Sequence, residues 1–189
     1  MIVQRYLVLL ALLWLGFARA EMPLLTVGDE VPDCELVDEQ GKTLHLRDYR
    51  GQAVALTFIF TRCPLASYCP LMSSHFLAAQ RELSKEAGDK KWHLLSLSFD
   101  PEHDTPDKLQ AYGKAHSANA SRWTFATGEG DAVIRFGASF GLTAKFEEGL
   151  LNHNLRTVVI DAKGRVQHLF KGNEWKPQEL VWELRKAMP

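Results

Sequence analysis

The chain has 189 residues, of which 46% are hydrophobic, so it is long enough for one domain with a sizeable buried core. Its net charge of −1 at pH 7 gives no electrostatic reason to expect nucleic-acid binding. Three cysteines are too few for a disulfide-built scaffold.

The first twenty residues are typical of a secretory signal peptide. Arg5 supplies a positive charge, a short apolar segment follows, and Ala18 and Ala20 form a small-residue cleavage site. The apolar segment is short for a membrane-spanning helix, which needs about 20 residues. We therefore predict a signal peptide over 1–20 and an exported or periplasmic domain over 21–189, soluble after cleavage. An uncleaved leader would instead anchor the protein in the membrane, facing the periplasm.

Strand-like and helix-like patterns alternate along the rest of the chain. The apolar runs at 53–60 and 92–99 are typical of strands buried on both faces, and amphipathic segments predict helices between and after them. In chain order we expect strands at 34–37, 43–46 and 53–60, a helix from Pro70 that ends at Gly88, a strand at 92–99, a helix from Thr105, a strand at 123–126, a helix at 131–140, a loop at 141–152, a hairpin of strands at 156–161 and 166–171, and a helix at 179–188.

This order predicts an α/β fold, with a central mixed sheet covered by helices on both faces and an N-terminal β-hairpin. Cys63 and Cys69 fall between the strand at 53–60 and the helix that begins at Pro70. Cysteines at the first strand-to-helix turn of a βαβ unit are the thioredoxin-like arrangement.

The two cysteines form a candidate reactive pair. Each is followed by a proline, and five residues separate them, so the loop can bring the sulfurs together. Cys69 lies at a helix start, where unpaired N–H groups and the helix dipole favour a thiolate, so we expect Cys69 to ionise readily. Copper(I) binding, thiol redox chemistry and a plain stapling disulfide are all compatible with this pattern.

His153 is the candidate third ligand. It precedes the strand at 156–161, which in this fold runs beside the strand that ends near Cys63. Asn152 and Asn154 flank it and are placed to orient the ring. Soft thiolates select Cu(I), imidazole accepts Cu(I) or Cu(II), and a closed zinc site would need a fourth protein ligand. The set Cys63, Cys69 and His153 therefore favours copper.

Two further residues of these types are expected to have structural roles. His75 lies six residues beyond Cys69 on the same predicted helix, which points it away from the thiols and towards packing or the surface. Cys34 stands where the pattern calls for an apolar residue, so we expect a small buried side chain.

Three stretches together resemble the Sco/SenC/PrrC family of thioredoxin-fold copper proteins, which help to assemble the copper centre of cytochrome c oxidase. They are VGDEVPDCELVDEQGKTLHLRDYRGQAVALTFIFTRCP, SLSFDPEHDTPDKL and NHNLRTVVIDAKGRV. The resemblance implies copper binding by Cys63, Cys69 and His153, an acidic position near the site at Asp100, and a client such as the copper-bearing oxidase subunit or another copper or thiol protein. From its position alone, Asp100 also suits a strand-end turn or a helix cap.

One departure concerns the loop. The family usually places three residues between the cysteines, whereas this chain places five, which bears on site geometry and partner recognition. The leading hypothesis is an exported copper metallochaperone. The alternative is a thiol-disulfide oxidoreductase that uses Cys63 and Cys69 to reduce partner cysteines, although the spacing is not the C-x-x-C of thioredoxins. A peroxidase is less favoured, and a binding module with a stapled loop is the third possibility.

Overall fold

The computed structural model of the chain describes residues 23–86, 91–147 and 150–189. The predicted signal peptide at 1–20 and Gly88, the predicted end of a helix, lie outside these residues.

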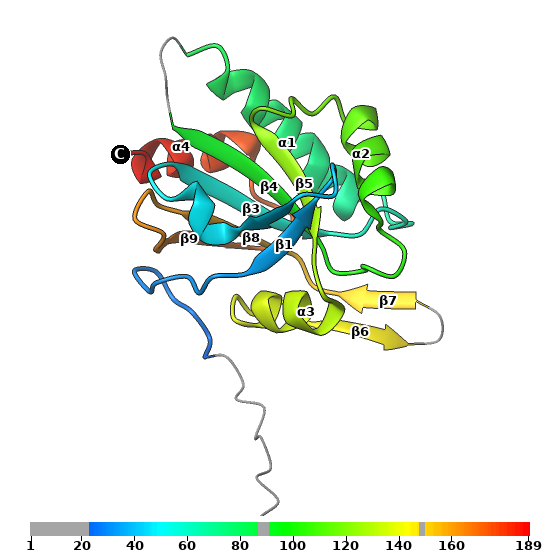
Figure 1. Cartoon of the computed structure of the whole chain (residues 1–189). Coiled ribbons are helices and arrows are strands. Elements are labelled where there is room, and N and C mark those ends of the chain that lie inside the picture. The colour runs from blue at the N-terminus through cyan, green and yellow to red at the C-terminus, as the bar shows by residue number, and fades with distance from the viewer. Residues whose placement is uncertain (1–22, 87–90, 148–149) are drawn as a thin grey trace, which may run out of the picture.

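A seven-stranded mixed sheet forms the centre of the molecule, in the order β2-β1-β5-β4-β3-β8-β9 (Figure 1). The middle strands β3, β4 and β5 are parallel to one another, whereas β8 and β9 on one side and β1 and β2 on the other are antiparallel to their neighbours. The strands are β1 Glu35–Asp38, β2 Thr43–His45, β3 Ala53–Ile59, β4 Trp92–Ser98, β5 Trp123–Thr127, β8 Arg156–Ile160 and β9 Val166–Lys171.

Helices cover both faces of the sheet, as predicted (Figure 1). On one face lie α1 (Cys69–Leu83), α2 (Pro106–Ala115) and α4 (Pro177–Ala187); on the other lies α3 (Gly130–Ala138). A short 3-10 helix at Leu46–Tyr49 follows β2. The α/β architecture and the N-terminal β1–β2 hairpin are thereby confirmed.

Strands β3 and β4 are buried along their whole length, because helices pack on both of their faces. Phe58 of β3 points towards α3 and contacts Phe136, with ring centroids 6.4 Å apart. On the opposite face, Trp123 of β5 packs against Phe76 of α1. This double-sided core fixes the end of β3, from which the cysteine loop leaves.

The prediction of a loop at 141–152 is wrong. Strands β6 (Ala144–Glu147) and β7 (Leu150–His153) form a separate antiparallel hairpin, in which Ala144 pairs with His153. Figure 1 shows this hairpin outside the central sheet, on the side of α3. Its strands include Ala144, Lys145, Glu147 and Asn152, which are residue types depleted from strands, so backbone pairing and packing decide its structure.

Candidate metal centre

A tight turn at the end of β3 positions Cys63. The Cys63 N–H donates to the Phe60 carbonyl over 3.2 Å, so Thr61 and Arg62 are the two central residues of a turn that ends in the cysteine. The Cys63 side chain is partly exposed. The turn therefore presents this sulfur at the surface of the molecule.

Cys69 is the first residue of α1 and is fully buried. The long loop before it contains a second turn, closed by the Tyr68 N–H on the Leu65 carbonyl at 3.0 Å. The Asn173 side-chain amide donates to the Ser67 carbonyl at 2.8 Å and braces this turn from the segment after β9. The extra residues of the loop thus form local structure that leaves Cys69 free to point back towards Cys63.

His153 reaches the site from the end of β7, not from the central sheet. Its Nδ1 lies 2.8 Å from the Asn154 carbonyl oxygen, which only accepts hydrogen bonds, so Nδ1 carries the proton. The ring is enclosed by Phe60, Tyr68 and Phe99, whose centroids lie 5.5, 5.4 and 5.1 Å from its own. These contacts fix both the tautomer and the orientation of the imidazole.

The prediction that flanking asparagines orient the ring holds only in part. The bond to His153 comes from the main-chain carbonyl of Asn154. The Asn154 side chain accepts from the Thr143 N–H and donates to the Gly141 carbonyl, so it closes the base of the hairpin instead.

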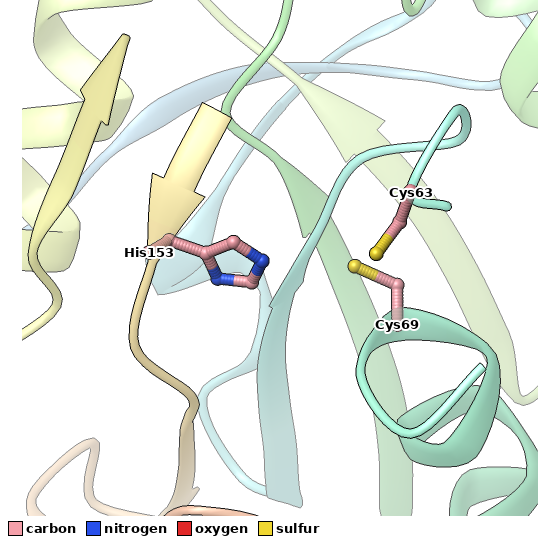
Figure 2. Close-up of side chains that lie close together, drawn as sticks. All are labelled: Cys63, Cys69 and His153. Atoms are coloured by element: carbon pink, nitrogen blue, oxygen red, sulfur yellow. The ribbon is translucent and has the colours of Figure 1, made fainter. Parts of the chain in front are cut away.

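The three predicted ligands converge. The sulfur atoms of Cys63 and Cys69 and a ring nitrogen of His153 all lie within 4.8 Å of one another. Figure 2 shows the two sulfurs facing each other and the imidazole pointing towards them. His153 Nε2 is buried and has no hydrogen-bond partner, and because Nδ1 is protonated this atom presents a lone pair. An orphaned buried acceptor beside two sulfurs fits a soft metal ion such as copper.

The two thiols differ strongly in acidity. Hydrogen bonding from the Cys69 thiol lowers the pKa of Cys63 to about 4 although burial opposes it, and the nearby His153 ring and the Cys69 backbone N–H add to the effect. The pKa of Cys69 is raised, because its thiol donates to Cys63 and because it is buried. The prediction that Cys69 ionises readily is therefore wrong: the first N–H of α1 stabilises the sulfur of Cys63.

The site opens to solvent through a pocket of about 430 Å³. Cys63 and His153 lie in its wall, and most of the remaining lining is apolar: Phe60, Pro64, Leu65, Tyr68 and Leu151. Leu65, at the tip of the cysteine loop, has 51% of its surface exposed. A bound ion at this centre would be reached from the Cys63 side, since Cys69 is closed off.

Asp100 lies next to the site but is not one of the converging groups. Its carboxylate accepts from Arg62 Nε at 2.8 Å and lies 3.1 Å from His103 Nδ1. Its carbonyl also accepts from the N–H groups of His103 and Asp104, so it builds the turn after β4 as well. Asp100 thus lies near the site, as the family resemblance implies, and also forms a strand-end turn, as its position in the sequence suggests. Arg62 links it to the cysteine turn.

The remaining sequence predictions of this kind are confirmed. His75 packs against Trp175, with ring centroids 4.7 Å apart. Cys34 is a buried free thiol whose pKa burial raises to about 11. Sequence reasoning missed the aromatic enclosure of His153 and the buried carboxylate of Asp104, which accepts hydrogen bonds from Thr61. The stretch FDPEHDTP does show a second aspartate four residues after Asp100, and this is the sequence signal that could have indicated Asp104.

The fold and the three converging ligands define a thioredoxin-like protein with a dithiol–imidazole centre. A model of the SCO1/SenC family matches residues 26–189, and the chain belongs to this family. It is 28% identical over 163 residues to the SCO1 protein homolog of Bacillus subtilis (strain 168), which covers 84% of this chain and 82% of that protein.

Solved structures show the same fold. Arabidopsis thaliana ScoI with copper bound superposes with a TM-score of 0.71 at 20% identity, over 84% of this chain and 99% of that one. BsSco, a member of the Sco family of cytochrome c oxidase assembly proteins in which a disulfide switch was identified, gives a TM-score of 0.73 at 24% identity, over 87% of this chain and 96% of that one.

Proposed function

We propose that this protein is an exported copper metallochaperone. One copper ion binds to the thiolates of Cys63 and Cys69 and to Nε2 of His153. The observation that carries the proposal is the convergence of these three atoms within 4.8 Å, with the imidazole lone pair buried and unpartnered. A site of two soft thiolates and one imidazole favours copper over harder cations, which prefer oxygen ligands.

Three protein ligands leave room for a fourth. That position would open into the apolar pocket beside Cys63, where a ligand of a partner protein can enter and take over the ion by exchange. The client is the copper-bearing subunit of cytochrome c oxidase, or another copper or thiol protein. Support comes from the copper-bound Arabidopsis relative and from BsSco, whose family is described as assembling cytochrome c oxidase.

The leader predicted at 1–20 supports export to the periplasm, with a membrane anchor as the alternative if it is not cleaved. In the described part of the chain, no helix combines the length and apolar character that crossing a bilayer requires.

Copper titration of the reduced protein tests the proposal. One equivalent should bind, and His153→Ala should weaken the affinity at least about tenfold, because loss of a ligand should cost no less than loss of a residue that supports one. The matched control is His75→Ala, which removes a histidine that packs against Trp175. Equal affinities for the protein and for His153→Ala would reject the ligand set.

A second candidate, a thiol-disulfide oxidoreductase, is favoured by the asymmetry of the cysteines. Cys63 is partly exposed with a lowered pKa, as an attacking thiolate requires, and Cys69 is buried behind it. The Cys63 thiolate would attack a partner disulfide and release one partner thiolate. Cys69 would then displace the second, so that two electrons pass to the partner and a Cys63–Cys69 disulfide forms.

The two functions separate at His153. Reduction of a disulfide-bonded peptide should survive His153→Ala, whereas copper binding should not. If the protein reduces the peptide but binds no copper in its reduced form, the oxidoreductase replaces the chaperone as the function.

A further inference from the structure

Two carboxylates of the turn after β4 hold the turn that carries Cys63. Thr61 and Arg62 are the central residues of that turn, and each is bound by one acid: Thr61 by Asp104 and Arg62 by Asp100. Asp100 bonds a half-exposed guanidinium, and Asp104 is fully buried. Of the two contacts, that of Asp104 is therefore the better shielded from water.

The Asp104 carboxylate accepts two hydrogen bonds from Thr61. Its Oδ2 accepts from the Thr61 backbone N–H at 2.9 Å, and its Oδ1 accepts from the Thr61 hydroxyl at 2.5 Å. The Ser98 hydroxyl, at the end of β4, donates to Oδ2 at 2.5 Å. A bidentate contact to both the main chain and the side chain of one residue fixes the position and the rotation of that residue.

The acid is itself held in place. The Asp104 N–H donates to the Asp100 carbonyl at 2.8 Å, and the Asp100 N–H donates to the Ser98 hydroxyl at 3.1 Å. The turn at 100–104 is thereby closed on itself and tied to the end of β4, which pairs with β3 along seven residues. Asp104 thus connects the rigid sheet to the cysteine turn.

We propose that Asp104 is a positioning residue for the dithiol–imidazole centre: by holding Thr61 it fixes the Phe60–Cys63 turn and so sets where the Cys63 sulfur meets Cys69 and His153. Cys69 does not depend on a comparable positioning residue, because it is the first residue of α1 and the helix fixes its place. The copper-dependent consequences rest on the proposed function, but the placement of the sulfur does not.

The test compares Asp104→Asn with Asp107→Asn. The first keeps the shape of the side chain and removes its charge and one acceptor oxygen; the second makes the same change at an exposed position on the first turn of α2. In Asp104→Asn, copper should dissociate about tenfold faster from the loaded protein, and the thiolate-to-copper absorption band should shift. Asp107→Asn should match the unmodified protein.

A metal-free measurement separates this inference from the proposed function. In reduced protein without copper, the equilibrium between dithiol and Cys63–Cys69 disulfide against glutathione should move about tenfold towards the dithiol in Asp104→Asn, because a freer Cys63 lowers the effective concentration of the pair. If no copper binds to any variant, the proposed function fails while this arm still decides the role of Asp104.

Thr61→Val covers the case in which Asp104→Asn does not fold. It removes only the hydroxyl partner of Asp104 and keeps the backbone N–H contact. A smaller shift of the glutathione equilibrium in the same direction is expected. If both variants fold and their glutathione equilibria equal that of Asp107→Asn, the proposal is overturned. If only Thr61→Val folds, the same equality in that variant overturns it.

Discussion

The acidity of Cys63 leads to a pH profile that distinguishes it from an ordinary thiol. Its pKa is about 4, compared with 9.0 for an unperturbed cysteine, chiefly because the Cys69 thiol donates to its sulfur. At pH 6 roughly one in a thousand ordinary thiols is ionised, whereas Cys63 is almost fully a thiolate. A thiolate of lower pKa is also a weaker nucleophile, by a factor of roughly 100 to 300 for a pKa that is lower by about five units.

The two factors act in opposite directions. Cys63 should therefore react about three to ten times faster than an ordinary thiol at pH 6 and about a hundred times slower at pH 9. Its alkylation rate should be flat between about pH 5 and pH 8, because the thiolate fraction no longer changes there. Iodoacetamide alkylation of the reduced protein, with the labelled peptides quantified by mass spectrometry, measures the rate at each cysteine separately.

Cys69→Ala tests the cause of the shift. It removes the thiol that donates to Cys63, so the onset of reactivity should move to higher pH. Cys34→Ala is the matched control, since it removes a buried thiol of raised pKa elsewhere in the fold. A Cys63 rate that climbs tenfold per pH unit between pH 6 and 8, as for a free thiol, would refute the reasoning, and so would an unchanged profile in Cys69→Ala.

Three further predictions concern other parts of the molecule. Burial lowers the pKa of His93 to about 4, so the unfolded chain binds the extra proton first, and stability should fall by about 3 kcal/mol as the pH drops from 6.5 towards 4. Urea unfolding should show a much smaller loss in His93→Gln; an equal loss would contradict this. Phe136→Ala opens a cavity between α3 and Phe58 and should lower the free energy of unfolding by about 3–5 kcal/mol. Ile134 on the same helix is more exposed, so Ile134→Ala should lower it by less than half as much; similar losses in the two variants would place Phe136 outside the core. Oxidation of Cys63 with Cys69 to a disulfide removes both thiolates, so metal analysis should find no copper until a reductant is added, and full loading of the oxidised protein would disprove the thiolate site.

The central sheet could be predicted because burial on both faces leaves a direct trace in the sequence. The segment of β3 is almost wholly apolar, that of β4 is apolar at four of its seven positions, and both predicted strands end within one residue of the observed ends. Prolines near the starts of α1, α2 and α4 mark the places where helices begin. These signals are local, so no knowledge of the tertiary structure was needed to find them.

The β6–β7 hairpin left no such trace. Its strands are four residues each, and although Ala144 and Phe146 alternate with Lys145 and Glu147 in β6, the apolar pair Leu150 and Leu151 interrupts the alternation in β7, so the pattern is too short to identify two strands. Leu151 and Ala144 line one pocket together with Ile134 of α3, so the position of the hairpin depends on neighbours distant in the chain. His153 could be predicted as a ligand from its chemistry, but not as the last residue of a separate hairpin.

Which of the two cysteines has the lower pKa could not be predicted from the sequence either. A helix start favours a thiolate in general, and that rule selected Cys69. Burial reverses the outcome here, because a negative charge is less stable on the fully buried sulfur of Cys69 than on the partly exposed sulfur of Cys63, which receives hydrogen bonds. Which sulfur is covered depends on the packing of α1 against the sheet, and that packing is not encoded at either cysteine.

The long cysteine loop shows which parts of the chain control the site. The loop has two residues more than the family usually has, which bears on the site geometry, and the three predicted ligand atoms nevertheless lie within 4.8 Å of one another. The turn at Leu65–Tyr68 takes up the added length, while the two sulfurs are fixed at the loop ends, by the Phe60–Cys63 turn on one side and the first residue of α1 on the other. Ligand geometry is thus decoupled from loop length. Residues 64–67 of the loop are exposed, so a change in their number alters the surface beside the centre, whereas Tyr68 stays packed against the His153 ring.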